Sequence, residues 1–353
     1  MKQLLAAPAL LIAFCLSASA QTPVDRPPQF VVMAFDNCTE LDRWQEWSDF
    51  TAEMNRDGPR VHFTFFVSGV NFIANANRSL YTGPQQRPGA SMINFGGSAD
   101  DVRKRVEYIN DLHKRGHEIA SHAVGHFNGG RWSASDWVRE FRAFDDAMHN
   151  VAQNNNLPGS VGFALKATEV TGFRAPYLAH SPGLYATLKE RGYRYDTSGN
   201  SDATEWPQKV DGVWRFNLAR LKVSGIGRPT LSMDYNLFMS QSRAVEDPSR
   251  AEQFRQQALQ TYLDYFKTNY TGNRAPLHIG HHFFDYQRGA YRRALIAFAR
   301  TVCGLPEVRC VSYAKLADFM DRLQPDTIAA YRKGDFPRAG APLLSVAGVA
   351  LNN

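Results

Sequence analysis

Apolar runs and segments of helical spacing alternate along the chain. Continuous runs rich in β-branched and aromatic residues are typical of buried strands, and they predict strands over 30–35, 61–67, 117–121, 172–175 and 277–282. Apolar residues three or four positions apart predict helices over 102–112, 133–148, 181–191, 247–266, 289–302 and 313–323. This alternation predicts an α/β protein with a parallel sheet and right-handed crossovers.

The length of 353 residues, without an internal repeat or an interdomain linker, fits one α/β barrel. Hydrophobic residues make up 44% of the chain and charged residues 21%, which is a globular composition that can bury a sizeable core. The formal net charge is +6, but Lys and Arg are scattered and form no basic stripe. We therefore expect no nucleic-acid partner, and the sequence indicates no oligomeric state.

The N-terminus has the pattern of a secretory signal peptide. Lys2 supplies a positive charge, residues 4–16 form an apolar stretch, and small residues ending at Ala20 form a cleavage site. No later stretch is apolar enough to span a bilayer, so we expect a secreted or periplasmic protein. The predicted organisation is a signal peptide over 1–20, a barrel over 21–325 and a loose C-terminal tail over 326–353.

Two cysteines flank a short loop near the end of the predicted barrel. Cys303 and Cys310 enclose a loop that contains a proline, and in an oxidising compartment this spacing favours a disulfide. Cys38 then stays unpaired, and we expect it to act as a small buried hydrophobic residue. The disulfide and the signal peptide both oppose a cytoplasmic barrel enzyme of sugar metabolism.

Several predicted strands end in side chains that can do chemistry. The first apolar run ends in Asp36 and Asn37, and the last ends in His282. His122 and Arg174 occupy similar positions at two other strands. In an α/β barrel the carboxyl ends of the strands meet at one rim, which carries the functional residues. We therefore expect these side chains to line one pocket.

A histidine pair is the strongest single element of this set. His122 and His126 are four residues apart, so on one helical turn both imidazoles project to the same side and can bind one metal ion. Two solvated or core histidines explain a lone pair of this kind about as often. The preceding segment, 118–121, favours the metal site because as a strand it would deliver His122 to the rim.

Short motifs with reactive side chains follow one another in a fixed order: Phe35-Asp36-Asn37, His122-Ala123-Val124-Gly125-His126, Arg174-Ala175-Pro176-Tyr177, Asp196-Thr197-Ser198 and a late histidine. This order resembles the polysaccharide deacetylase family, also called NodB-like proteins or carbohydrate esterase family four. The segment 273–277, Asn-Arg-Ala-Pro-Leu, is similar to the animal chitin deacetylase branch in particular. The resemblance covers roughly residues 30–322.

The resemblance implies a distorted (β/α) barrel, a single domain of NodB-homology type, that hydrolyses N-acetyl groups of a sugar polymer. It implies a divalent metal ion, usually zinc, with His122 and His126 as ligands and Asn37 at the third ligand position. Asp36 then corresponds to the general base, and Arg174 to the residue that orients it. These roles agree with the chemistry, since amide hydrolysis needs an activated nucleophile and stabilisation of charge.

The remaining roles concern the oxyanion and the leaving group. The backbone N–H of Tyr177 is expected to stabilise the oxyanion, and His282 to protonate the departing amine. His281 and His282 point to opposite faces of a strand, so only one should enter the pocket. Asp196, with Asp202 as the alternative, is expected to hold the imidazole of this acid.

Two tryptophans and one alanine complete the residues that we singled out. Trp132 and Trp206 are candidates for stacking on sugar rings, although core packing is the expected fate of at least one. Ala123 stands where the family usually has Ser or Thr after the first histidine of the pair, which we expect to tune the site rather than abolish it.

Asn37 is the main departure from the family pattern, which usually has an aspartate ligand there. Three interpretations follow. Asn37 binds the metal weakly, because a neutral amide oxygen is a poorer zinc ligand than a carboxylate. Alternatively Cys38 or another carboxylate replaces it. In the third interpretation the metal is absent and the protein is a sugar-binding pseudoenzyme.

The sequence therefore predicts a metal-dependent N-deacetylase whose partner is a polysaccharide containing N-acetylglucosamine. Chitin, poly-N-acetylglucosamine and peptidoglycan are the candidate substrates, and the sequence does not rank them. The alternatives are a non-catalytic glycan-binding protein on the same barrel and an esterase for O-acetyl groups. The retained acid and base favour an enzyme, because binding alone needs no general acid.

Overall fold

The computed structural model describes residues 24–58, 60–340 and 344. The predicted signal peptide, residues 1–20, lies outside the described residues, as does the predicted tail beyond residue 340 except for residue 344. Within the described ranges, no helix combines the length and the apolar character that a bilayer crossing requires.

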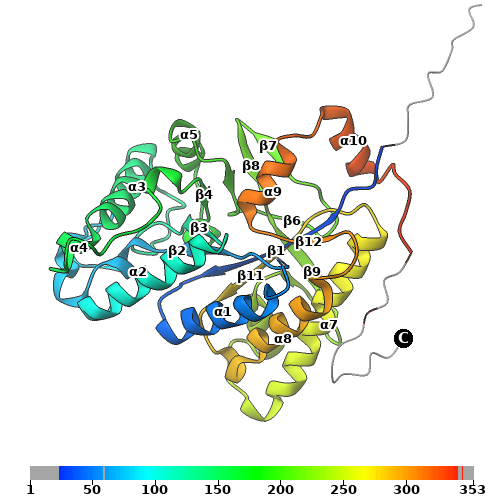
Figure 1. Ribbon diagram of the computed structural model, residues 1–353, viewed down its shortest axis with the longest axis horizontal. Helices are drawn as coiled ribbons and strands as arrows, with labels where there is room; N and C mark the ends of the chain where they lie inside the picture. Colours follow the sequence, from blue (N-terminus) through cyan, green and yellow to red (C-terminus); the bar gives the residue numbers. More distant parts are fainter. Residues whose placement is uncertain (1–23, 59, 341–343, 345–353) are drawn as a thin grey trace, which may run out of the picture.

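A curved, mostly parallel sheet forms the centre of the described part of the chain (Figure 1). Its strand order is β11-β1-β2-β3-β4-β5-β8-β7, with β12 also beside β1, and only the β7–β8 pair is antiparallel. The strands are β1 (Gln29–Asp36), β2 (Thr64–Val67), β3 (Glu118–Ser121), β4 (Gly172–Phe173), β5 (Tyr195–Asp196), β7 (Gln208–Val210), β8 (Val213–Arg215), β11 (Leu277–His282) and β12 (Val308–Cys310).

A small second sheet continues the curve beyond β11. It has the order β10-β9-β6 and consists of β6 (Asn200–Asp202), β9 (Leu218–Lys222) and β10 (Pro229–Leu231). Met233, just after β10, bridges to Gly280 of β11 in parallel fashion. The chain thus curls its strands around a common centre with two sheets, which confirms the predicted distorted (β/α) barrel.

Helices cover the outside of the sheet (Figure 1). They are α1 (Leu41–Met54), α2 (Ala99–Lys114), α3 (Ala134–His149), α4 (Val151–Asn154), α5 (Pro182–Glu190), α6 (Asp234–Ser242), α7 (Ala251–Thr271), α8 (Tyr286–Val302), α9 (Tyr313–Met320) and α10 (Pro325–Lys333). Ser98 and Ser133 begin α2 and α3, and each forms a capping box with the aspartate three residues later. Such boxes satisfy N–H groups that a helix start leaves unpaired.

The core is built around β1, which is buried along its whole length. Its central position between β11 and β2 explains the continuous apolar run, because neither face of this strand meets water. Phe35 packs against Trp47, Phe63 and Phe65, so α1 and β2 are held to the strand by aromatic contacts. This packing fixes the end of β1, where the first candidate site residues follow.

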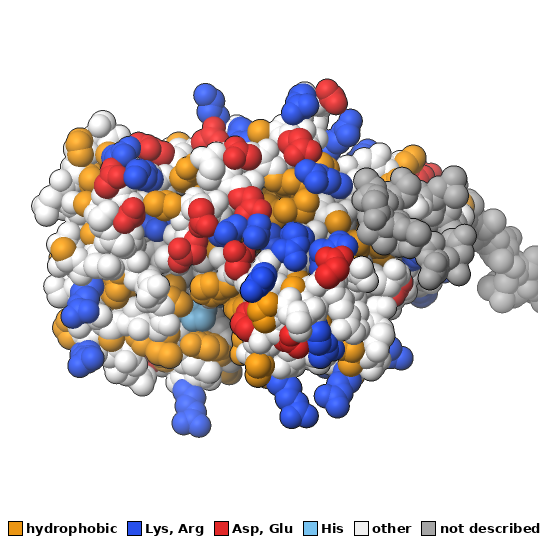
Figure 2. Space-filling model, turned by 90° about the horizontal axis from the view of Figure 1, so that it is seen from below, with side chains coloured by type: hydrophobic (Ala, Val, Ile, Leu, Met, Phe, Trp, Pro, Cys, Tyr) orange, Lys and Arg blue, Asp and Glu red, His pale blue; other side chains and the backbone are white. Residues whose placement is uncertain are grey.

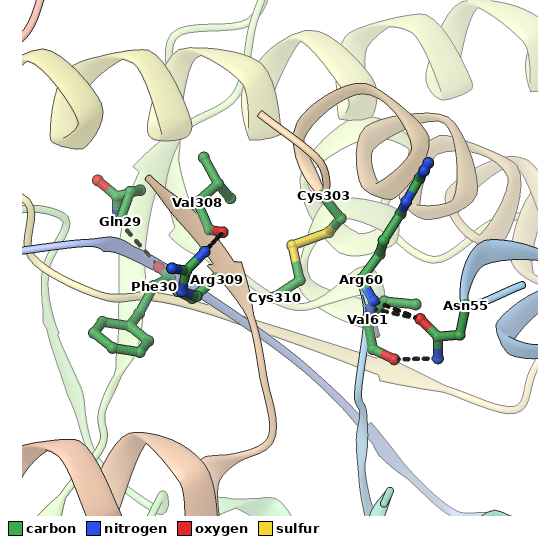
Figure 3. Close-up of a disulfide and its surroundings, with 9 residues drawn as sticks. All are labelled: Gln29, Phe30, Asn55, Arg60, Val61, Cys303, Val308, Arg309 and Cys310. Carbon is green, nitrogen blue, oxygen red and sulfur yellow. Dashed lines mark hydrogen bonds between the residues drawn. A yellow bond between two sulfur atoms is a disulfide. The ribbon is translucent and has the colours of Figure 1, made fainter. Parts of the chain in front are cut away.

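The predicted disulfide is confirmed. Cys303, at the end of α8, is bonded to Cys310 of β12, which pairs with Val31 of β1 (Figure 3). The bond ties an outer helix to the central strand. Cys38 is free and buried, as expected.

Some elements were not predicted from the sequence. Helices α1 and α6, the second sheet, and the short strands β7 and β8 belong to this group. Part of the segment that we expected to be a loose tail forms α10, whose Tyr331 packs on Trp206. The domain limits drawn from the sequence remain predictions.

Candidate active site

One pocket gathers most of the candidate site residues at the carboxyl ends of the barrel strands. Its volume is about 420 Å³, within the range of small-molecule sites. The candidates that line it are Asp36, Asn37, His122, His126, Tyr177 and His282. Arg174 and Asp196 do not line it, and both are fully buried behind its wall.

The register of the sheet explains why Asp36 and His282 meet. In the parallel pairing of β1 with β11, Asp36 lies opposite His282. These residues are far apart in the sequence, yet Asp36 is the last residue of β1, His282 is the last residue of β11, and the two strands are neighbours in the sheet. The convergence predicted from strand ends is therefore realised by the topology.

Asp36 is held by a buried ion pair. Arg174 Nη1 donates to Asp36 Oδ1 at 2.8 Å, and both side chains are almost completely excluded from solvent. Thr197 Oγ1 accepts from Arg174 Nε at 2.7 Å, and Phe66 lies under the guanidinium. Burial alone would raise the pKa of Asp36, but Arg174 and the imidazoles of His122 and His282 outweigh burial and lower the pKa. Asp36 is thus an ionised carboxylate in a fixed orientation.

The imidazole of His282 is held by a carboxylate that the sequence did not suggest. His282 Nδ1 lies 2.6 Å from Oδ1 of Asp234, and the backbone N–H of His282 donates to the other oxygen at 2.8 Å. Burial lowers the pKa of His282, but Asp234, and more weakly Asp36, outweigh burial and raise the pKa. His282 is therefore suited to carry a proton into the pocket.

Asp196, predicted to hold this imidazole, occupies another place, and so the prediction was wrong. Its Oδ1 accepts from the hydroxyl of Ser198, whose oxygen in turn accepts from the backbone N–H of Ala175. Asp196 therefore supports the segment that carries Arg174. The alternative, Asp202, is exposed on β6 and lies 3.8 Å from Arg220. The physical reason is topological: α6, not β5, begins beside the end of β11.

His281 points away from the pocket, as alternation along a strand requires. Its Nε2 lies 2.9 Å from the hydroxyl of Tyr262 on α7, and its Nδ1 lies 3.7 Å from Asp234. Burial lowers the pKa of His281 to about 4, so this ring is neutral. The carboxylate of Asp234 therefore forms its ion pair with His282 and not with His281. Of the two neighbouring histidines, His282 is the one that lines the pocket.

Asn37, His122 and His126 form a neutral set of potential metal ligands. The rings of His122 and His126 are 5.0 Å apart, and burial lowers the pKa of both, in His126 to about 3. Nδ1 of His122 lies 2.8 Å from the carbonyl oxygen of Arg174, so this nitrogen carries the proton and Nε2 offers its lone pair. Both imidazoles are therefore neutral, and each has one nitrogen lone pair to offer to a metal ion.

The chemistry of this donor set, two neutral imidazoles and an amide oxygen, fits a cation. Asn37 Oδ1 and His126 Nδ1 are buried, and neither has a hydrogen-bond partner in the described structure. Buried polar atoms are usually paired, and unpaired ones also occur elsewhere in the described structure, for example at Trp47 Nε1 and His117 Nε2. The described residues contain no cluster of three or more His, Cys, Asp or Glu side chains that could hold a metal ion, and the third member of this set is an amide. The donors fit a divalent cation, with less ligand charge than a carboxylate would bring.

The backbone around the pocket is strained at several non-glycine residues. Asn37, Ala123, His126, Tyr177 and Leu178 all have φ between +50° and +60°. Such conformations cost about 1–3 kcal/mol each and persist only where the surroundings fix them. Asn tolerates this region better than most residues, which suits the sharp turn after β1. Their concentration at one pocket indicates a functional site.

Other singled-out residues lie away from the pocket. The thiol of Cys38 faces the carbonyl oxygens of Phe35 and Phe66 in the core, and burial raises its pKa, so Cys38 does not replace Asn37 as a ligand. Trp132 packs on Trp137 and is 7% exposed, so it is a core residue. Trp206, 2% exposed, is also a core residue.

Exposed aromatic rings border the pocket instead. Tyr177 is 56% exposed and lies 4.9 Å from the ring of His126. Tyr235 and Phe284 are also exposed, and each packs on Tyr286, which lines the pocket. Figure 2 shows a face of the molecule on which a histidine side chain is visible in a hollow bordered by hydrophobic side chains.

Comparison with known proteins places the chain near polysaccharide deacetylases. No protein-family profile matches the sequence. The chain is 23% identical over 301 residues to chitin deacetylase 8 of Bombyx mori, an alignment that covers 79% of this chain and 74% of that protein. It is 25% identical over 155 residues to chitin deacetylase 1 of Bombyx mori, covering 40% of this chain and 26% of that protein.

The fold is also similar to the solved structure of a putative polysaccharide deacetylase from Mycobacterium smegmatis. The superposition covers 86% of this chain and 95% of that protein, with 18% sequence identity and a TM-score of 0.49. Both curated relatives are chitin deacetylases, so the resemblance found in the order of the motifs is confirmed.

Proposed function

We propose that the chain is a metal-dependent deacetylase that hydrolyses N-acetyl groups on a polysaccharide containing N-acetylglucosamine. One observation carries the proposal: a single pocket brings together a carboxylate fixed by Arg174, an imidazole fixed by Asp234, and the His122–His126 pair. Amide hydrolysis needs a base, an acid and stabilisation of negative charge, and these groups supply each of them.

Asp36 acts as the general base. Its lowered pKa keeps it ionised, and the bond from Arg174 leaves its other oxygen to accept a proton from the attacking water. Arg174 is a positioning residue, because it touches Asp36 and not the pocket. Thr197 and Phe66 fix the guanidinium in turn.

His282 acts as the general acid. Asp234 binds Nδ1, so the proton to be transferred is on Nε2. The raised pKa favours the protonated ring, and the poor amine leaving group receives this proton as the bond to the acyl carbon breaks. Because Asp36 and His282 are in register on adjacent strands, acid and base act from neighbouring walls of the pocket.

Asn37, His122 and His126 would hold a divalent cation, for which zinc is the best match to imidazole ligands. When bound, the cation would supply Lewis acidity toward the acetyl carbonyl. The role of this chain is to present two neutral imidazoles and one amide oxygen beside Asp36. We also propose that the backbone N–H of Tyr177 stabilises the oxyanion.

The surroundings of the pocket support a carbohydrate substrate. Tyr177, Tyr235 and Phe284 present exposed aromatic faces, which stack well on sugar rings. The disulfide between Cys303 and Cys310 supports the proposed secreted or periplasmic location, where such bonds persist. Chitin, poly-N-acetylglucosamine and peptidoglycan glycan are the candidate polymers.

Asn37 favours a second candidate function, a glycan-binding protein that has lost catalysis. A ligand set without a carboxylate binds zinc less tightly, and a site without its cation would bind sugar and not hydrolyse it. The buried ion pairs at Asp36 and at His282 oppose this alternative, since sugar binding requires neither. An esterase acting on O-acetyl groups would use the same side chains.

One experiment separates these functions. Acetate release is measured with purified protein on N-acetylglucosamine oligomers and on acetylated xylan, with EDTA and with added Zn²⁺ or Co²⁺, for the native sequence and for Asp36→Asn. The deacetylase predicts metal-stimulated release from the amide substrate that Asp36→Asn abolishes. Release from xylan alone indicates the esterase, and sugar binding without release under any metal indicates the pseudoenzyme.

A further inference from the structure

A buried carboxylate outside the pocket binds the loop that carries the histidine pair. Glu140 lies on α3 and is 1% exposed. Its Oε1 accepts the backbone N–H of Val124 at 2.9 Å and that of Gly125 at 3.2 Å. These two residues stand between His122 and His126, so one oxygen atom reaches the middle of the loop.

This loop requires outside support because its backbone is strained. Ala123 and His126 both have positive φ, +60° and +56°, in a stretch of five residues. A strained segment persists only where neighbours over-determine its conformation. Ala123 has no side-chain hydrogen-bonding group. Its N–H donates locally to Ser121 Oγ at 3.3 Å, and the N–H groups of the next two residues find their acceptor on another element.

The carbonyl side of the loop is held by backbone bonds. Gly69 and Val70 donate N–H groups to the carbonyl oxygens of Ala123 and Val124, and Met92 donates to that of Gly125. The N–H groups of Val124 and Gly125 face the other way and donate to Glu140. Removing the carboxylate would therefore leave two buried amide donors without their acceptor.

Tyr81 closes the contact from the other side. Its hydroxyl donates to both carboxylate oxygens of Glu140, at 3.0 and 2.8 Å. A Cβ atom at Gly125 would lie 2.6 Å from the rings of Tyr81 and Phe127, so the loop is pressed directly against the tyrosine. Burial raises the pKa of Glu140, while the bonds from Tyr81 and the two amides oppose the rise.

We infer that Glu140, locked by Tyr81, is a positioning residue that sets the geometry of His122 and His126 for one divalent cation. It touches neither the pocket nor a ligand atom, and acts only through the N–H groups between the two histidines. That the loop binds a cation rests on the proposed function. That Glu140 clamps the loop, through the N–H groups of Val124 and Gly125, rests on the contacts alone.

The chain offers a matched control in Glu118. This carboxylate also binds a tyrosine hydroxyl, that of Tyr195 at 2.8 Å, and a backbone N–H, that of Ala314 at 2.8 Å. Burial raises its pKa as well. It stands at the start of β3, the end opposite to His122, and is partly buried. Glu118 variants therefore report the effect of losing a partly buried, tyrosine-bound carboxylate without touching the histidine loop.

The test compares Glu140→Leu with Glu118→Leu, and Glu140→Gln with Glu118→Gln. Three quantities are measured: thermal unfolding with EDTA present, the affinity for Zn²⁺ by titration calorimetry, and hydrogen exchange of the Val124 and Gly125 amides in metal-free protein. We expect both Leu variants to lose stability. Only Glu140→Leu should weaken Zn²⁺ binding, by about tenfold to a hundredfold, as removal of groups that orient metal ligands does.

Glu140→Gln should recover much of this affinity, because its amide oxygen can still accept from both N–H groups. If a Leu variant fails to fold, the Gln pair decides: Glu140→Gln should bind Zn²⁺ more weakly than Glu118→Gln and exchange the two amides faster. Equal affinities and equal exchange rates in the paired variants would overturn the inference. If the native protein binds no Zn²⁺, the proposed function loses its cation, and amide exchange in metal-free protein alone decides the clamp.

Discussion

The two halves of the pocket differ in how completely their polar atoms are paired. In the acid–base half, Asp36 is bound by Arg174 and His282 by Asp234, and all four groups are buried or nearly so. In the cation half, Asn37 Oδ1 and His126 Nδ1 have no partner in the described structure. The proposed function assigns the unpaired atoms of the second half to a bound cation.

The halves also differ in charge. The acid–base half consists of two ion pairs, each balanced within itself, while the cation half has three neutral donors. Residue 37, a candidate ligand by resemblance to polysaccharide deacetylases, is a neutral amide and not a carboxylate. Under the proposed function, this difference predicts a site that keeps its acid and base but binds its cation less tightly than a site with a carboxylate ligand would.

The largest expected effect is on catalysis, and it should leave cation binding almost unchanged. Asp36→Asn keeps an oxygen acceptor for Arg174 and removes the base, so we expect kcat for acetate release to fall by about 10²–10⁴-fold. Zn²⁺ affinity should change little, because Asp36 is not in the proposed ligand set. Acetate assays and calorimetry on the same preparation check both statements; a large loss of Zn²⁺ affinity would place Asp36 in the cation half.

The next effect concerns stability. Arg174→Leu removes one partner of a buried ion pair and leaves Asp36 charged and unpaired, which should cost about 3–5 kcal/mol in the free energy of unfolding. The loss should shrink as the pH falls, because protonation of Asp36 removes the unpaired charge. Urea denaturation at pH 7 and pH 4 measures it. A loss that is the same at both pH values would mean that packing on Phe66, and not charge, dominates.

A gain is expected in the cation half. Asn37→Asp adds a negative charge beside His122 and His126, and cation affinity rises with ligand charge, so we expect Zn²⁺ to bind about tenfold more tightly or better. Titration calorimetry measures the dissociation constant, with Cys38→Ser as a neighbouring substitution that faces the core. An unchanged affinity in Asn37→Asp would mean that residue 37 is not a ligand.

The smallest effect concerns the pH profile of the acid. His282 must be protonated to act, so activity is lost as the pH rises through its pKa, which Asp234 holds above the usual 6.5. Asp234→Asn should move this alkaline limb to lower pH, and activity measured at a fixed pH on the limb should fall about tenfold for every pH unit that the limb moves. The charged groups that act on His282 are Asp234, Asp36 and Arg174. A profile with an unmoved alkaline limb would assign that limb to another group.

The sequence allowed the barrel and most of the pocket to be predicted for identifiable physical reasons. Buried parallel strands need unbroken apolar runs, so β1 and β11 and the polar residues at their ends were visible. The predicted helix start at Ser133 is marked by local bonds alone, in a capping box with Asp136. The disulfide followed from the spacing of Cys303 and Cys310 and the predicted compartment.

Asp234 could not be found in this way. It lies in a region of short strands and a weakly amphipathic helix, where no run or periodicity marks an element. Its contact with His282 depends on how the second sheet meets β11, which is a property of the tertiary fold. Glu140 was missed for a similar reason: within α3 it stands next to the apolar stripe, and only the folded chain brings the loop at 124–125 to it.

The most direct test of the proposed cation site is a crystal structure of the protein soaked with Zn²⁺, with anomalous data collected at the zinc edge. We predict one strong peak in the pocket, bound by His122 and His126 at about 2.0–2.1 Å, with Asp36 and His282 facing the same space. A pocket without zinc at saturating concentration, or zinc held by other residues, would contradict this prediction.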